Sequence, residues 1–331
     1  MDKIFLTDIE SDIYYKKEYA DLYINNDNEI FEYTYAENEF YVKFKSIKKP
    51  IKSVSGIIID EELYDLETPY GYGGPISNSN DRGFLTRALV KYRSHCKENK
   101  IVCEFIRLHP FNEIIESSFI FDMFHEERRV VIVNLMDSSE DRRMGYSKTT
   151  RNIVKKAKRN LSIKSDSDNI DGFIDAYYKT MKKNDANNFF FFGKEYFSSL
   201  KVIKEIKLIE IQLNDQLVST GFFMLCNELA HYHLSANDQN LSKENGNYLL
   251  LDAAFEIAKE QGCKYMLLGG GRTSSAEDSL LKFKSKFSKN NMPFYIAGLD
   301  FIPEKRIELN QLWANQNKDV NPPSLFQLYR V

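Results

Sequence analysis

Hydrophobic and polar residues alternate along much of the first third of the chain, a pattern typical of half-buried strands. The alternation, together with short apolar runs, predicts strands over 29–35, 39–47, 53–60, 101–108 and 128–135. A helical period over 82–99 interrupts this series and follows a glycine-rich loop at 68–78. The first part of the chain is therefore expected to form a mixed sheet with helices.

Longer helical periods mark the second part of the chain. They predict helices over 138–160, 170–184, 248–262 and 277–288, with strands over 217–226, 230–236, 264–270 and 294–302. This order is similar to that of the acyl-CoA N-acyltransferase (GNAT) fold, and the first part resembles a degenerate copy of it. We therefore expect an α/β (α+β) protein with two tandem GNAT-like domains, 1–136 and 137–331, each a mixed, mostly antiparallel sheet flanked by helices.

Length, charge and cysteine spacing limit the function classes. A chain of 331 residues exceeds the size at which one core usually keeps growing. The 45 basic and 48 acidic residues nearly cancel, which argues against a general nucleic-acid coat protein but allows a local basic patch. The four cysteines lack the spacing of metal ligands, so no metal site is expected. Without a signal-peptide pattern or an apolar run of ~20 residues, we expect a cytoplasmic protein with no transmembrane segment.

The loop 68–78, TPYGYGGPISN, combines several glycines with two prolines and two tyrosines. It lacks the third glycine of a dinucleotide-binding GxGxxG motif and the Gly-Lys-Ser/Thr of a phosphate-binding P-loop. One interpretation is a plain tight turn. The other is a rigid wall beside a bulky ligand, where Gly73 and Gly74 let the backbone approach and Tyr70 and Tyr72 offer flat faces and hydroxyls.

The segment 142–164 holds nine basic residues and no acidic one. On a helix, Arg151, Lys155 and Arg159 fall on one face, where like charges repel one another. Contact with a polyanion would offset this cost, and the candidates are tRNA, a pyrophosphate-linked sugar and an anionic membrane surface. The alternative is a solvated helix that joins two domains.

Candidate catalytic groups occur later in the chain. His231 and His233 share one face of a predicted strand, and histidine titrates near neutral pH, so both are candidate proton acceptors. The alternative is an ordinary pair of core or surface histidines. Gly269 to Gly271 lie between a predicted strand and a helix that carries Lys284, which is either a functional cation or a surface lysine of an amphipathic helix.

Taken together, the motifs resemble the FemABX family and the wider FemAB-like proteins. In chain order they are TPYGYGGP, FIRLHPF (105–111), RNIVKKAKRN, YYKTMKKNDANNFFFFGKEYFSSL (177–200), HYHLSA, NGNYLLLDAA, LGGG and LLKFKSKF, which together span about 64–298. The resemblance implies two GNAT-like domains and aminoacyl transfer in cell-wall precursor synthesis, or a role in surface polysaccharide synthesis.

Site residues follow from this resemblance. It implies that Lys284 lies in the substrate cleft, where its charge holds a phosphate or the growing negative charge of the reacting carbonyl. It also implies substrate-binding roles for Tyr70, Tyr72, Gly73, Gly74, Arg107, His109, Tyr196, Gly269, Gly270 and Phe283. Phe192 stands where the family often has arginine, and His231 and His233 stand where relatives tend to carry tyrosine, so the acceptor is left open.

The chain lacks a GxSxG nucleophile elbow and an evident Cys-His pair, which favours direct attack by an amine without an acyl-enzyme. The expected donor is aminoacyl-tRNA or acyl-CoA, with no permanently bound cofactor. The stretch LSKENGNYLL keeps only Gly246 of the pyrophosphate-binding glycines of GNAT acetyltransferases, which weakens the case for CoA.

The expected acceptor is a sugar- or lipid-linked envelope precursor, with possible transient contact to the inner membrane surface. The alternatives are acyl-CoA-dependent N-acylation of a nucleotide-activated amino sugar and a non-catalytic binding module.

Overall fold

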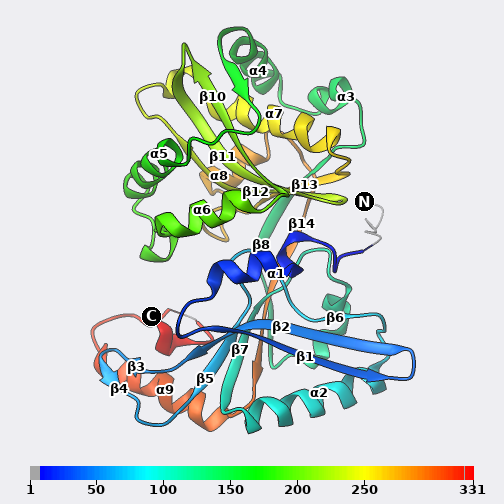
Figure 1. Ribbon diagram of the computed structural model, residues 1–331, viewed down its shortest axis with the longest axis vertical. Coiled ribbons are helices and arrows are strands. Elements are labelled where there is room, and N and C mark those ends of the chain that lie inside the picture. The colour runs from blue at the N-terminus through cyan, green and yellow to red at the C-terminus, as the bar shows by residue number, and fades with distance from the viewer. Residues whose placement is uncertain (1–7, 324) are drawn as a thin grey trace. The chain divides into compact units, whose positions relative to one another are not determined.

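The computed structural model of the protein describes residues 8–323 and 325–331 (Figure 1). The chain forms two compact units: unit 1 contains 8–10, 23–127 and 294–331, and unit 2 contains 11–22 and 128–293. This division differs from the expected boundary between 136 and 137. The difference arises because the last segment pairs and packs with the strands of unit 1, whereas a short early segment packs in unit 2.

Unit 1 has a sheet in the order β1-β2-β5-β7-β14, in which β5 and β7 are parallel and the other neighbours antiparallel. Its strands are β1 (Glu29–Glu37), β2 (Phe40–Pro50), β3 (Ser53–Val54), β4 (Ile57–Ile58), β5 (Tyr64–Glu67), β6 (Ile76–Ser77) and β7 (Ile101–Arg107), with the start of β8 (Met123–Asn134) and most of β14 (Asn291–Asp300). Its helices are α2 (Arg82–Glu98), η3 (Glu113–Ile120), α9 (Pro303–Gln316) and η6 (Leu328–Arg330), with η2 (Asp21–Tyr23) at the boundary.

Two helices bury β7 in unit 1. Helix α2 begins where the side chain of Asp81 accepts a hydrogen bond of 2.6 Å from the backbone N–H of Phe84. One core joins α2 to Ile101 and Ile106, and a second core joins Trp313 of α9 to Val102. Because both faces are covered, β7 is almost continuously apolar and buried, as its sequence predicts.

Unit 2 has a sheet in the order β8-β13-β12-β11-β10-β9, in which β12 and β13 are parallel and the other neighbours antiparallel. Its further strands are β9 (Ser162–Lys164), β10 (Ile206–Leu213), β11 (Gln216–Cys226), β12 (Leu229–Asn237) and β13 (Tyr265–Gly269). Its helices are η1 (Ile13–Tyr15), α1 (Lys17–Ala20), α3 (Ser139–Met144), α4 (Lys148–Asn160), α5 (Ile170–Lys183), η4 (Asn188–Phe190), α6 (Lys194–Val202), η5 (Ser242–Glu244), α7 (Gly246–Glu260) and α8 (Ser279–Lys284).

Helices cover both faces of the unit 2 sheet (Figure 1). On one face, α4 and α7 share a core with Phe223 of β11. On the other face, Phe173 of α5 and Phe197 of α6 contact the ring of Phe222, with the Phe173 and Phe222 centroids 4.6 Å apart. Successive residues of a strand point to opposite faces, so Phe222 and Phe223 anchor the two layers.

Both units repeat one layout, in which a helix connects two parallel neighbours: β5, α2 and β7 in unit 1, and β12, α7 and β13 in unit 2. The predicted fold class is therefore confirmed. Some elements differ in length. The strand expected over 53–60 is a two-stranded ribbon turning at Ser55 and Gly56, both with positive φ, and the helix expected over 138–160 is divided near Gly145. Across the described residues, each helix is too short or too polar to cross a bilayer.

Candidate functional site

The candidate site of unit 2 lies where two parallel strands stop pairing. The paired register of β12 with β13 covers Leu229 to His231 opposite Tyr265 to Leu267, whereas β12 continues beside β11 to Asn237. The residues of β12 after His231 therefore belong to a part of the strand that has left the β12–β13 ladder.

A β-bulge coincides with this point. Phe222 pairs with Leu234 and Phe223 pairs with Tyr232, so His233 is the extra residue on β12. A second irregularity lies in β13 between Leu267 and Gly269. Bulges re-aim side chains and are over-represented beside active sites, so the two irregularities point to this end of the sheet.

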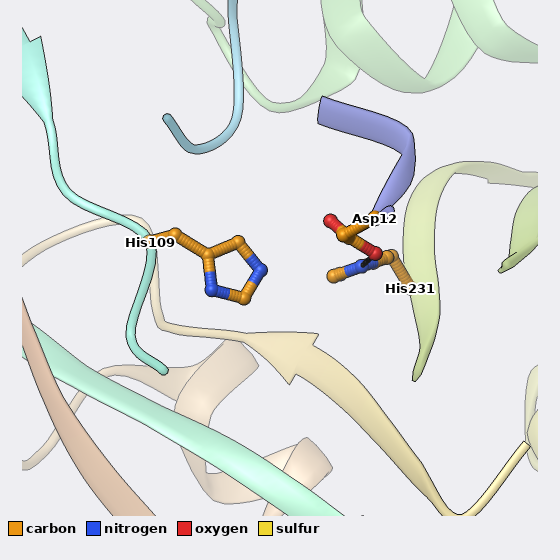
Figure 2. A group of neighbouring side chains, drawn as sticks. All are labelled: Asp12, His109 and His231. Atoms are coloured by element: carbon orange, nitrogen blue, oxygen red, sulfur yellow. Dashed lines mark hydrogen bonds and ion pairs between the residues drawn. The ribbon is translucent and has the colours of Figure 1, made fainter. Parts of the chain in front are cut away.

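His231 is buried and forms a hydrogen bond with a residue from the start of the chain. Its Nε2 lies 2.9 Å from Oδ1 of Asp12, whose side chain is also buried (Figure 2). The ring of Tyr14 contacts the imidazole edge-on, with centroids 4.8 Å apart. The sequence analysis missed Asp12, since no local motif around it signals a partner on β12.

His233 forms a different pair. Its Nε2 lies 2.9 Å from the hydroxyl of Tyr196, whose ring stacks on Phe192 at 4.4 Å between centroids. Burial and the neighbouring His231 lower the pKa of His233 to about 3. The ring is therefore neutral at physiological pH and is a weak base, although it can hold the hydroxyl of Tyr196 in place.

Lys284, at the end of α8, is buried with 6% of its surface exposed. Its Nζ donates a hydrogen bond of 2.7 Å to the carbonyl of Gly270 and lies 5.6 Å from the ring centroid of Tyr232. Burial lowers the pKa of Lys284 to about 7, an effect that Asp278 opposes and Arg128 increases. The lysine is thus no ordinary surface residue of an amphipathic helix, because a buried amine with this pKa is typical of functional sites.

The remaining candidates of unit 2 have structural partners. Gly269 has a φ of +73°, and a Cβ on Gly270 would lie 2.8 Å from the backbone oxygen of Arg129, so packing and conformation both require glycine. Phe283 packs edge-on against Phe287 in the core, with centroids 5.6 Å apart.

The glycine loop of unit 1 is tightly packed. The ring of Tyr72 is buried and contacts His109 edge-on, with centroids 5.3 Å apart, and the backbone N–H of His109 donates to the carbonyl of Gly73 at 2.9 Å. Gly74 has a φ of +100°, and a Cβ there would lie 2.6 Å from Leu108. Tyr70 is only partly buried. The loop therefore has the properties of the tight turn, with Tyr70 as its more accessible aromatic face.

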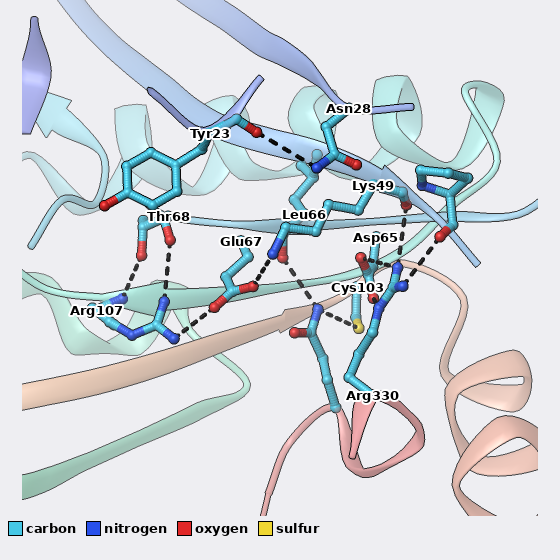
Figure 3. A network of polar contacts seen from close by, with 12 residues as sticks. Tyr23, Asn28, Lys49, Asp65, Leu66, Glu67, Thr68, Cys103, Arg107 and Arg330 are labelled. Atoms are coloured by element: carbon cyan, nitrogen blue, oxygen red, sulfur yellow. Dashed lines mark hydrogen bonds and ion pairs between the residues drawn. The ribbon is translucent and has the colours of Figure 1, made fainter. Parts of the chain in front are cut away.

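Arg107 is part of a polar network in unit 1 (Figure 3). Its guanidinium forms an ion pair of 2.5 Å with Glu67 and donates to the carbonyl of Thr68 at 3.1 Å. Lys49 also forms an ion pair with Glu67. Burial raises the pKa of Glu67, but the charges of Arg107 and Lys49 outweigh it and hold the pKa at about 2. The predicted substrate ligand Arg107 thus has a structural role in this network.

The predicted basic face of α4 is divided between two roles. Arg151 donates to the backbone carbonyls of Met144 and Tyr146 at 2.9 and 2.6 Å, and so fixes the junction of α3 and α4. Lys155 and Arg159 are exposed to solvent. These two residues keep the accessibility that contact with a polyanion requires.

Comparisons with known proteins agree with this architecture. Residues 142–284 match the family model of the acetyltransferase (GNAT) domain. Among curated proteins, no sequence matches the chain. The solved structure of FemX is similar over 92% of this chain and 94% of its own, with a TM-score of 0.65 and 12% identity. L-PGS from Bacillus licheniformis is similar over 85% of each chain, with a TM-score of 0.54 and 14% identity. A conserved protein of unknown function from Bacteroides thetaiotaomicron has a TM-score of 0.52 at 15% identity over 88% of this chain and 91% of its own.

The matched domain and the fold agree: residues 142–284 match a GNAT domain, and the chain has a GNAT-type fold. The architecture of the chain is similar to that of FemX over nearly its whole length, as the FemAB-like resemblance implies.

Proposed function

We propose that this protein transfers an aminoacyl or acyl group onto an amine of a cell-envelope precursor, either of peptidoglycan or of a surface polysaccharide. The observation that carries the proposal is the set of buried ionisable groups on and beside β12, within the segment that matches the GNAT domain. His231 supplies a base that is paired with a carboxylate, and Lys284 supplies an amine with a pKa of about 7.

Direct attack by the amine is the mechanism that the described side chains support. The four cysteines are buried and free, and burial raises the pKa of each, to about 11 for Cys226 and about 12 for Cys263. Such thiols stay protonated and do not act as nucleophiles at neutral pH. Protonated Lys284 would instead hold a phosphate of a substrate or the oxyanion that develops on the carbonyl.

The exposed part of α4 favours aminoacyl-tRNA as the donor. Lys155, Lys156, Lys158 and Arg159 are all exposed on this helix, which has no acidic residue. Gly246, at the start of α7, would place a Cβ 2.6 Å from Val218, so packing alone requires this glycine. The single glycine left from the CoA-binding pattern is therefore no evidence for a bound pyrophosphate. We place the reaction in the cytoplasm, where a tRNA donor and a sugar- or lipid-linked acceptor meet.

Acyl-CoA remains the second candidate donor, because the matched family model is that of an acetyltransferase domain. Binding of bulk charged tRNA and of acetyl-CoA to the purified protein, followed over a salt series, separates the two donors. We expect steeply salt-dependent tRNA binding and no CoA signal. Lys155→Glu should weaken tRNA binding and reduce the salt slope by about 1.

The matched control is Lys91→Glu, which makes the same charge change at an exposed lysine of α2. It should leave tRNA binding unchanged. Tight CoA binding that is indifferent to Lys155→Glu would establish the acyl-CoA alternative. Binding of neither donor would favour the non-catalytic binding module.

A further inference from the structure

A segment from the start of the chain, 11–22, is built into unit 2. The carbonyl of Ser11 accepts hydrogen bonds from Cys226 Sγ at 3.1 Å and from Asn227 Nδ2 at 3.4 Å, at the turn between β11 and β12. Lys16 forms an ion pair of 2.6 Å with Glu205, just before β10. These contacts fasten the segment to the strand pair that carries the histidines.

The fastened segment delivers one carboxylate to one imidazole. Asp12 and His231 are 2% and 1% exposed, and their side chains meet at 2.9 Å. A carboxylate only accepts hydrogen bonds, so it selects the imidazole tautomer that carries its proton on Nε2. The lone pair of the neutral ring is then on Nδ1, and the carboxylate stabilises the imidazolium that forms when Nδ1 takes a proton.

The second histidine of β12 does not share this arrangement. Its described partner at Nε2 is the hydroxyl of Tyr196, and its pKa is about 3. A base this weak accepts a proton from an attacking amine poorly, since efficiency depends on a pKa near the working pH. The two histidines, which are equivalent in the sequence pattern, are therefore distinguished by their partners.

We propose that Asp12 is a positioning residue that prepares His231 to accept the proton of the attacking amine. This inference rests on the proposed function and assigns a role to the early segment of the chain. The amine nitrogen forms a bond to the ester carbonyl carbon while its proton passes to His231 Nδ1. The tetrahedral intermediate then expels the alcohol oxygen, which takes that proton. The products are an amide and a free hydroxyl, and no further reactant is needed.

The tautomer of His231 can be tested without any substrate. NMR of the full chain labelled with ¹⁵N at histidine, with His231 assigned by the loss of its signals in His231→Gln, should show protonated Nε2 and unprotonated Nδ1. Asp12→Asn keeps the shape of the side chain but removes its charge, and Asp12→Ala removes the partner; both should increase the tautomer protonated on Nδ1. A wild-type ring protonated on Nδ1, or a tautomer that ignores both variants, would overturn the inference.

Lys16→Ala is the matched control, because it removes an anchor of the same segment without touching His231. It should leave His231 in the same tautomer as in the wild type. If Lys16→Ala also removes the proton from Nε2 of His231, the effect of the Asp12 variants comes from loss of segment docking, and the specific role of Asp12 is overturned.

Kinetics complete the test, with transfer of ¹⁴C-labelled amino acids from bulk charged tRNA to a pool of nucleotide-linked cell-wall precursors. Asp12→Asn should lower kcat about 10²-fold with little change in KM. The double variant with His231→Gln should be no slower than His231→Gln alone, because both act on one proton transfer. Full activity of Asp12→Asn would overturn the inference alone. An inactive wild type would overturn the proposed function and, with it, the role of Asp12, even where the NMR result holds.

Discussion

The two units place the same strand-helix-strand layout in different electrostatic settings. In unit 1, Glu67 of β5 pairs with Arg107 of β7 and with Lys49 of β2, and its pKa falls to about 2. In unit 2, Lys284 beside β12 has the opposite character, since burial lowers its pKa to about 7. These ion pairs of unit 1 therefore serve stability, whereas unit 2 keeps one buried amine, Lys284, whose pKa lies near neutral pH.

The largest effect should follow from removing the shifted amine of unit 2. Lys284→Met should lower kcat/KM about 10²- to 10³-fold, because no cation remains to hold the developing negative charge. In the wild type, kcat/KM should contain a descending limb near pH 7, where the free enzyme loses the lysine proton. Transfer assays from pH 5.5 to 9 measure both. Activity close to that of the wild type in Lys284→Met would remove the lysine from the mechanism and leave the contrast between the units without a functional meaning.

The second effect, which concerns the free energy of unfolding and not catalysis, should follow from breaking the ion pairs of unit 1. Arg107→Met leaves the largely covered Glu67 with one cation fewer and should destabilise unit 1 by about 3 kcal/mol. Urea unfolding followed by fluorescence measures this directly, because the one tryptophan of the chain, Trp313, is buried in unit 1.

The double variant Arg107→Met with Glu67→Gln is the control for this experiment. It removes both charges and should recover most of the lost stability. If Arg107→Met instead unfolds like the wild type but fails to bind precursor, the substrate-binding role predicted for Arg107 from the sequence would be restored.

The sequence predicted those features of the molecule that depend on local periodicity. The apolar run of β7, the helical period of α2 and the hairpin of β11 and β12 all appear where expected. Strand β10 was missed, although its residues largely alternate between apolar and polar. The Asn214-Asp215 pair after it is also a turn signal, and both residues have positive φ in the structure. Helix α9 was also missed, since its charged and polar residues obscure the period that buries Leu309 and Trp313.

The site was less predictable because its properties depend on distant contacts. His231 and His233 look equivalent in sequence, and only the partners Asp12 and Tyr196 separate them. Asp12 is 219 residues away from His231 along the chain, a distance over which no motif operates. The pKa of Lys284 likewise depends on burial, which spacing alone does not encode.

A third prediction concerns Glu104, a buried carboxyl of unit 1 that has no cationic partner among its described contacts. Glu104 is buried and accepts hydrogen bonds from Ser46 at 2.6 Å and Tyr92 at 2.9 Å, and burial raises its pKa from 4.5 to about 7. The folded state therefore keeps a proton that the unfolded state loses as the pH rises above 4.5. Stability should fall between pH 4.5 and 7, by about 3 kcal/mol from this group, and then stay level. Glu104→Gln should remove this part of the pH dependence, as followed by urea unfolding at pH 5 and pH 8, and parallel pH curves for both proteins would contradict the assignment.

The smallest effect should come from one hydroxyl in the unit 1 network. Tyr329 donates a hydrogen bond of 2.7 Å to Asp65. Arg330 also holds Asp65, through an ion pair of 2.6 Å that Figure 3 shows. Tyr329→Phe leaves the ion pair intact but deprives a buried carboxylate of one donor, so it should cost about 1–2 kcal/mol in urea unfolding followed at Trp313. Tyr64→Phe is the matched control, because it removes a hydroxyl whose partner, Glu62, is exposed, and it should change stability by less than about 0.5 kcal/mol. Equal losses in the two variants would mean that burial adds nothing to this hydrogen bond, and that the charges of unit 1 stabilise it without help from their neutral neighbours.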